Sequence, residues 1–112
     1  MRGRKWRDWR MRERRKEWLE EMRAEGRAPK LLDDGRRAKL YMLGRRVTVE
    51  RNGRKGKVGH PVFAIWCGGR VIRRSAIYRW VYRTYEMVEK MTNYEFKQFA
   101  RMEGIEDDGR EA

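Results

Sequence analysis

Six consecutive apolar residues, Val62 to Cys67, constrain the fold of this 112-residue chain more than any other stretch. The run is too short for a typical helix and contains Val, Phe, Ile and Trp, so it predicts a central strand covered on both faces. Its limits are marked in the sequence. Pro61, which cannot donate to a strand ladder, precedes it, and Gly68-Gly69 follow it as a hairpin signal.

Two further strands are predicted beside this one. Val47 and Val49 alternate with polar residues, a pattern that indicates a strand with one buried face. Asn52-Gly53 follows and supplies the positive φ angles that a tight hairpin needs. Val71-Ile72, after the second hairpin signal, forms a short return strand. The chain therefore predicts an antiparallel sheet over about residues 45–74.

The period changes from 2 to 3.6 after Ser75, which is predicted to cap a helix. One stripe of that helix carries its apolar residues, which are Ile77, Trp80, Val81, Val88 and Met91. Thr92 and Glu95 fit a capping box for a second helix, which Gly104 ends. The predicted fold class is α+β: a small antiparallel sheet of three or four strands, packed by this C-terminal helix pair and preceded by a basic N-terminal helix.

Residues 1–30 are predicted to form a basic helical arm, because residues 5–25 contain neither Pro nor Gly. Its apolar stripe (Met11, Trp18, Leu19 and Met22) leaves three interpretations open: the arm docks on its own domain, folds only on a partner, or forms a homodimer contact. Residues 31–104 are the predicted binding domain and residues 105–112 an acidic flexible tail.

Within that domain, residues 33–44 are interpreted as a second N-terminal helix. Asp33 or Asp34 is its cap, and Gly44 is its left-handed end. The apolar positions that support this helix are Ala38, Leu40, Tyr41 and Leu43.

Charge points to the kind of partner. The chain has 30 basic and 17 acidic residues, a net charge of +13, and 22 of the basic residues are arginine. Arginine binds phosphate in a forked geometry and stacks on bases, so the bias fits nucleic acid. A GC-rich coding genome would also raise arginine over lysine, but it does not explain the net charge.

The predicted nucleic-acid-binding residues are cations and tryptophans in three groups. The loop after the first strand contributes Arg51, Arg54, Lys55 and Lys57. The strand-to-helix junction, where a helix N-terminus favours phosphate, and the helix itself contribute Arg70, Arg73, Arg74, Arg79 and Arg83. The N-terminal arm contributes Arg4, Lys5, Trp6, Arg7, Trp9 and Arg10.

The two tryptophans of the arm are interpreted either as base-stacking rings or as residues packed on the domain. Tyr78, Tyr82 and Tyr85 have the same two interpretations, and at least two of them are expected in the core.

Catalysis is not expected. The chain has one histidine (His60), one serine (Ser75) and one cysteine (Cys67), too few for a nucleophilic triad or a Cys/His metal site. No metal or other cofactor is predicted. No stretch approaches the roughly twenty apolar residues of a membrane span, and no signal-peptide core is present, so an intracellular protein is expected, in cytoplasm or nucleoid, or in a host cell if viral.

The predicted function is binding of duplex DNA or structured RNA, mainly through phosphates. The alternative is a small, possibly virus-encoded, inhibitor or adaptor that binds a nucleic-acid-processing enzyme or complex. In either case the partner is polyanionic or carries an acidic surface.

Overall fold

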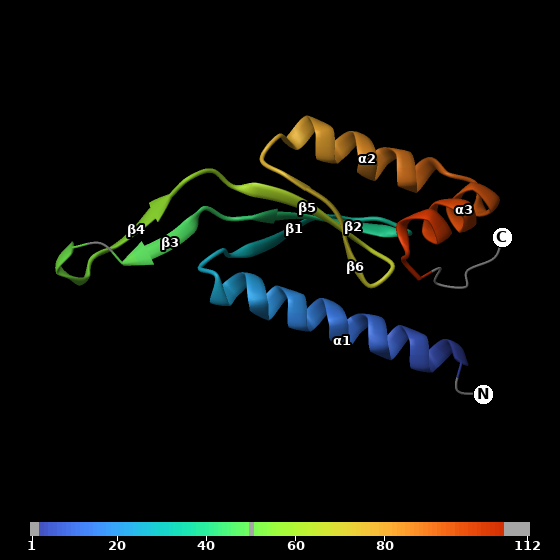
Figure 1. The fold of residues 1–112 in the computed structure, drawn as a ribbon, viewed down its shortest axis with the longest axis horizontal. Helices are drawn as coiled ribbons and strands as arrows, with labels where there is room; N and C mark the ends of the chain where they lie inside the picture. Colours follow the sequence, from blue (N-terminus) through green and yellow to red (C-terminus); the bar gives the residue numbers. More distant parts are fainter. Residues whose placement is uncertain (1–2, 50, 107–112) are drawn as a thin grey trace.

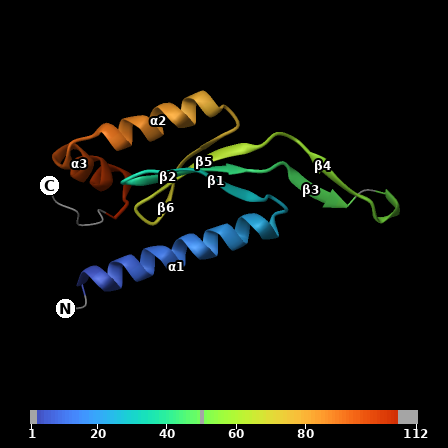
Figure 2. The ribbon, with the colours of Figure 1, turned by 180° about the vertical axis from the view of Figure 1, so that it is seen from behind.

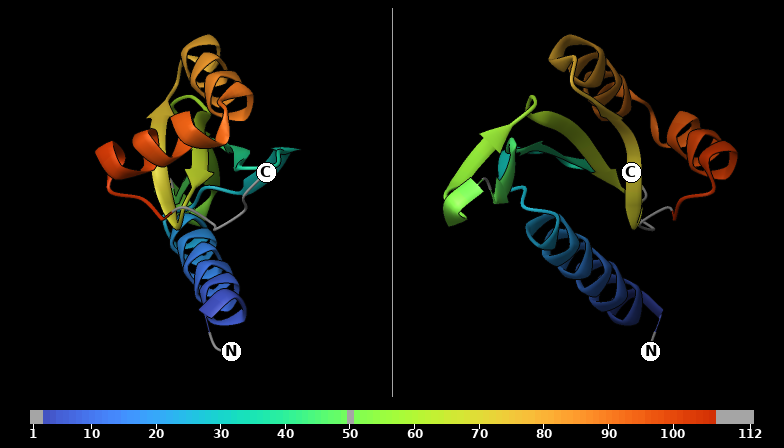
Figure 3. Two further views of the ribbon diagram at one scale, coloured as in Figure 1. Left: turned by 90° about the vertical axis from the view of Figure 1, so that its right-hand side faces the viewer. Right: turned by 60° about the vertical axis from the view of Figure 1, so that its left-hand side comes forward.

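The computed structural model describes the backbone of residues 3–49 and 51–106 and the side chains of residues 8–48 and 52–106. The fold is α+β, as predicted, and has three layers (Figures 1 and 2). Helix α1 (Gly3–Ala24) lies on one face of a sheet, and helices α2 (Tyr78–Lys90) and α3 (Asn93–Glu103) lie on the other. The sheet between the two helical layers is seen in Figure 3.

Four antiparallel strands form the sheet, in the order β1-β2-β5-β6. They are β1 (Pro29–Asp34), β2 (Ala38–Leu43), β5 (Val62–Cys67) and β6 (Arg70–Ser75). Strands β3 (Arg46–Val49) and β4 (Lys55–Val58) pair only with each other in the described chain. Because β3 follows β2 and β4 precedes β5, the two central strands of the sheet continue into this ribbon (Figure 1).

Strand β5 is covered on both faces, as its unbroken apolar sequence predicts. Ala64 and Trp66 pack with Trp18 and Met22 of α1. Ile65 and Cys67 belong to the second core cluster, under α2 and α3. Alternate side chains of a strand point to opposite faces, so a strand between two helical layers needs apolar residues at every position.

The predicted helix over residues 33–44 is wrong, because these residues form the β1–β2 hairpin and strand β2. Leu40 faces α2 and α3, whereas Tyr41 and Leu43 face α1. Burial on both faces removes the alternation that identifies a strand from sequence. The sheet therefore begins at residue 29 rather than about 45, and one helix, not two, precedes it.

Helix α1 docks on the sheet through the stripe that the sequence singles out. The Trp18 ring stacks on Trp66 and meets Tyr41 edge to face, each with ring centroids 5.2 Å apart. Glu106 also binds the helix, with its Oε1 2.5 Å from Arg10 Nη2 and 3.5 Å from Arg14 Nη1. Trp18 and Met22 are buried within one chain, so a homodimer through this stripe would lack both residues.

The C-terminal end of the chain is part of the fold as far as residue 106. Ile105 lies in the core beneath α2 and α3, and the amide of Glu106 donates to the carbonyl of Gly68. The sequence places both residues in the acidic tail. The rest of that tail, residues 107–112, lies outside the described residues.

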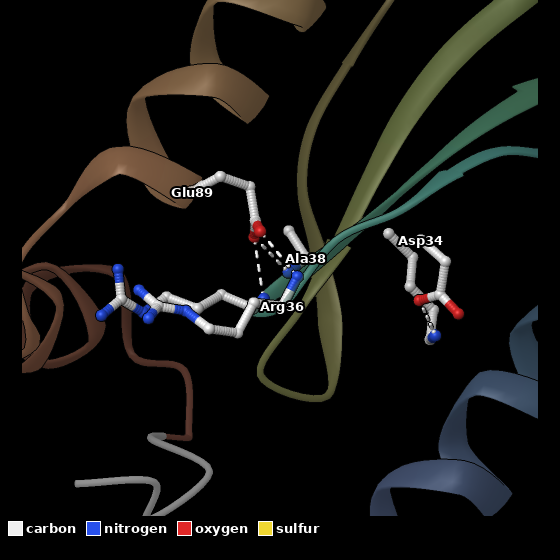
Figure 4. Close-up of polar contacts among 6 residues, drawn as sticks. Asp34, Arg36, Ala38 and Glu89 are labelled. Atoms are coloured by element: carbon white, nitrogen blue, oxygen red, sulfur yellow. Dashed lines mark hydrogen bonds and ion pairs between the residues drawn. The ribbon is translucent and has the colours of Figure 1, made fainter. Parts of the chain in front are cut away.

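Glu89 of α2 joins the helical layer to the turn between β1 and β2 (Figure 4). Its carboxylate accepts hydrogen bonds from the backbone amides of Arg36, Arg37 and Ala38 at 2.6, 2.8 and 2.9 Å. Gly35 lies against the same contact, since a Cβ there would be 2.4 Å from Tyr85 Oη. Burial, together with a hydrogen bond to Asp33, raises the pKa of the Tyr85 hydroxyl. The turn is thus held by charge-assisted hydrogen bonds from three main-chain amides to one carboxylate.

The predicted helix boundaries are confirmed at α3 and corrected at α2. Thr92 and Glu95 form the capping box, and Gly104 takes the left-handed C-cap conformation with φ 65°. Ser75 is not the N-cap of α2. It ends β6 and its Oγ accepts from the amide of Ile77, which is the N-cap.

The apolar stripe predicted for α2 is only partly correct. Val81 and Val88 are buried, whereas Ile77 and Trp80 are exposed. Of the three tyrosines, Tyr85 alone is buried, not the two or more expected. None of the helices in the described part of the chain is long and apolar enough to cross a membrane.

Candidate nucleic-acid interface

The β3–β4 ribbon projects from one end of the sheet and gives the molecule its longest dimension (Figure 1). The principal extents are 56 × 33 × 21 Å and the Cα radius of gyration is 16.0 Å. A compact domain of this length would have a radius of gyration of about 13 Å. A two-stranded ribbon is marginally stable alone, so this one depends on its continuity with β2 and β5.

The tip of the ribbon is the predicted Asn-Gly hairpin. Asn52 has φ 67° and Gly53 has φ 73°, the pair of positive angles for which this dipeptide is favoured. A Cβ added at Gly53 would meet none of the described atoms within 4 Å, and both Asn52 and Gly53 are exposed.

Contacts with the turn after α1 hold the base of the ribbon. The amide of Val47 donates to the carbonyl of Gly26 at 2.9 Å. The Arg27 guanidinium donates to the carbonyls of Gly44 and His60, at 3.1 and 3.4 Å, one on each side of the ribbon base. Helix α1, which the sequence treats as a separate arm, therefore orients the ribbon through the residues that follow it.

Gly26 should be difficult to replace. It has φ +83°, and a Cβ at this position would lie 2.7 Å from the carbonyl oxygen of Val47. We expect Gly26→Ala to lower the free energy of unfolding by about 3 kcal/mol, from left-handed backbone strain plus displacement of the ribbon base. Chemical denaturation measures this loss.

Gly104→Ala is the matched control for that substitution. Gly104 has φ +65° and nothing within 4 Å of its would-be Cβ, so its loss should be the backbone strain alone, about 1 kcal/mol. Equal losses at the two glycines would show that the close approach to Val47 has no energetic importance.

Positive charge is concentrated on the ribbon. Residues 45–57 include six basic residues and one acidic residue. Arg54, Lys55 and Lys57 are exposed, and none of them forms an ion pair with a carboxylate of the described residues. The side chain of Arg51, also predicted as a contact, lies outside the described set. Arg54, Lys55 and Lys57 can therefore bind an external anion without first breaking an ion pair to the described residues.

The predicted buried face of the first strand is wrong at Val47. Val47 is 40% exposed, and the side chain of Val49, predicted on the same face, lies outside the described set. Val58, for which no placement is predicted, is 44% exposed. Val47 lies opposite Lys57, and Val58 lies opposite Arg46. Because opposed residues share a face, each face of the ribbon presents an exposed valine beside a cation.

The second predicted group does not form one surface with the hairpin. Arg70 lies at the end of β6 away from the ribbon, opposite Cys67, and donates to the carbonyl of Glu103 at 3.1 Å. Arg74 points to the α1 face, 3.7 Å from Met22 Sδ. Arg73 pairs with Ile65, and so lies on the α2 face, the side that also carries Arg79 and Arg83. Alternation along β6 divides neighbouring arginines between faces.

The third predicted group is only partly described. The side chains of Arg4, Lys5, Trp6 and Arg7 lie outside the described set. Trp9 is half exposed, and Arg10 is paired with Glu106. The ion pair lowers the availability of Arg10 for an external phosphate.

Two arginines of the ribbon were missed by sequence reasoning. Arg45 and Arg46 are exposed at its base, and Arg46 Nε donates to the Glu25 carbonyl at 3.3 Å. Their position directly before the valine alternation was the available signal.

The residues with nucleophilic or metal-binding potential lie apart. Cys67 is buried at one end of β5, whereas Ser75 lies opposite Phe63 at the other end of that strand. Across the described residues, no group of three or more His, Cys, Asp or Glu side chains is placed to hold a metal ion.

Comparison with known proteins gave no match to a family model, to a curated protein or to a solved structure. Function must therefore be argued from the surface itself.

Proposed function

We propose that the protein binds duplex DNA or structured RNA through the β3–β4 ribbon, mainly by contacts to phosphates. The observation that carries this proposal is the unpaired charge on the ribbon. Arg54, Lys55 and Lys57 extend from the fold without a carboxylate partner among the described residues, in a segment with six basic residues and one acidic residue.

The shape of the ribbon suits a nucleic-acid groove. A two-stranded antiparallel ribbon is narrow enough to enter the major groove of B-DNA, which is about 12 Å wide. Gly53 and Gly56 carry no side chains, so the backbone near the tip can approach a phosphate closely. The exposed Val47 and Val58 can contact sugars and base edges beside the cations.

Salt dependence tests the proposal. Fluorescently labelled random-sequence duplex DNA and an RNA hairpin are titrated with protein between 50 and 300 mM salt. If most of the six basic residues of the ribbon contact phosphates, the logarithm of the association constant should fall with the logarithm of salt concentration with a slope of about −5 for DNA. Affinity that does not change over this range, or no binding to either nucleic acid, would overturn the proposal.

A further inference from the structure

An exposed tryptophan near the start of α2 stands outside the hydrophobic core. Val81, Tyr85 and Val88 form the buried side of the helix, whereas Trp80 is 47% exposed. Helix α2 begins at the end of the sheet from which the ribbon leaves (Figure 1). Trp80 is the third residue of α2 and therefore belongs to the turn of the helix at that end of the sheet.

A shallow cleft of about 380 Å³, largely open to solvent, lies beside Trp80 between α2 and the edge strand β6. Arg73 of β6 and Trp80, Arg83 and Thr84 of α2 line it. The Thr84 hydroxyl donates to the Trp80 carbonyl at 3.3 Å, which leaves its oxygen as an acceptor beside the cleft. No carboxylate lines the cleft, and neither arginine forms an ion pair within the described residues.

We propose that this cleft is a stacking subsite for one unpaired base of a nucleic acid, with Trp80 as the stacking ring and Arg73 and Arg83 as contacts to the adjoining phosphates. The inference rests on the proposed function and narrows its substrate class. A protein with a groove-binding ribbon and a separate base-stacking cleft toward the same end of the sheet would prefer duplexes that carry a short single-stranded extension.

The chemistry of the lining favours a nucleotide. Every base offers a flat face to an aromatic ring, and the phosphates on each side of it are matched by cations from two different elements. An acidic peptide would satisfy the two arginines but gives the indole face no flat partner.

Three ligands test the subsite: a blunt duplex, the same duplex with a four-nucleotide single-stranded extension, and the extension strand alone. We expect the wild-type protein to bind the extended duplex at least fivefold more tightly than the blunt one. Trp80→Ala should abolish this preference and leave blunt-duplex affinity within twofold, whereas Trp80→Phe should keep part of it. Tyr94→Ala removes a 73% exposed ring from α3 and is the matched control, with the preference intact.

A photo-crosslink locates the base independently of affinity. With 5-iodouracil in the extension, the major crosslinked peptide should contain Trp80, and Trp80→Ala should remove it. Trp80→Ala also removes the covered half of the side chain, so its thermal midpoint should fall, and the binding assays are run at a temperature at which both proteins are fully folded.

Three results would overturn the subsite: an extension preference that survives in Trp80→Ala, a crosslink to another residue, or equal weakening of all three ligands by Trp80→Ala. Polyglutamate that displaces the extension only from protein with Trp80 would assign the cleft to an acidic peptide instead. If the wild type fails to bind the blunt duplex but binds the extension strand through Trp80, the ribbon proposal fails and the stacking subsite stands.

Discussion

Replacing Arg54, Lys55 and Lys57 together by alanine should weaken duplex binding by about two to three orders of magnitude at 0.1 M salt. Each lost phosphate contact removes about 0.9 from the magnitude of the salt slope, so the triple variant should show a slope smaller by about 2.7. The three side chains are exposed and the ribbon is joined to the sheet by backbone, so stability should change little. Fluorescence anisotropy over the salt range used for the wild type measures both quantities.

The matched control removes the same charge elsewhere. Lys90, Lys97 and Arg101 are exposed on α2 and α3, at the end of the molecule away from the ribbon (Figure 1). Their combined replacement by alanine lowers the net charge equally and should reduce affinity less than tenfold, through long-range attraction alone. Similar losses in the two triple variants would mean that binding responds to net charge and not to the ribbon.

Glu89→Ala should cause a large loss of stability, although Glu89 lies outside the apolar core. It leaves the amides of Arg36, Arg37 and Ala38 without the carboxylate that accepts all three (Figure 4). Hydrogen bonds to a charged group are worth more than neutral ones, and part-buried donors left unpaired are costly, so we expect a loss of about 3 kcal/mol. A thermal melt should show the midpoint lowered by about 10 °C or more.

Glu86→Ala controls for removing a glutamate from the same helix. Glu86 is exposed, and its nearest cation is Lys90, 3.8 Å away at i+4. An exposed pair of this kind contributes less than about 0.5 kcal/mol, so the midpoint should hardly move. If Glu89→Ala behaved like this control, the turn would be stable without the carboxylate and the hydrogen bonds to it would be incidental.

Prediction from the sequence succeeded where a short sequence pattern is compatible with only one local structure. The consecutive apolar side chains of β5 are all removed from water only if both faces of the strand are buried. The Asn52-Gly53 turn and the Thr92–Glu95 capping box are short-range patterns whose geometry follows from the residues themselves. The β1–β2 hairpin failed for the opposite reason. Asp33-Asp34-Gly35 suits a helix start as well as a turn, and β2 is buried on both faces, so its pattern carries no period of two.

The candidate site was predictable in composition but not in arrangement. The charge of the hairpin is visible in the sequence, but alternation at Val47 cannot reveal whether a layer covers that face. Nor could the division of Arg73 from Arg74 be anticipated without the register of β6, because residues adjacent in sequence look like one patch until the strand is identified. Trp80 lies on the apolar stripe of the predicted helix and is therefore expected in the core. The helical period shows which residues share the stripe, but it does not show where the cover over that stripe ends.

Strands β2 and β5 continue directly into β3 and β4. The distance that the ribbon extends from the sheet can therefore change while the rest of the fold stays the same. Adding one residue to each strand near the tip extends it by about 3.4 Å and reverses which face each side chain beyond that point occupies, whereas adding two to each restores the facing. The core beneath would be unaffected in either case, since the ribbon is joined to it only through the base. The length of the ribbon can therefore change by inserting one residue into each of its two strands at a time, without changing the packing of the sheet.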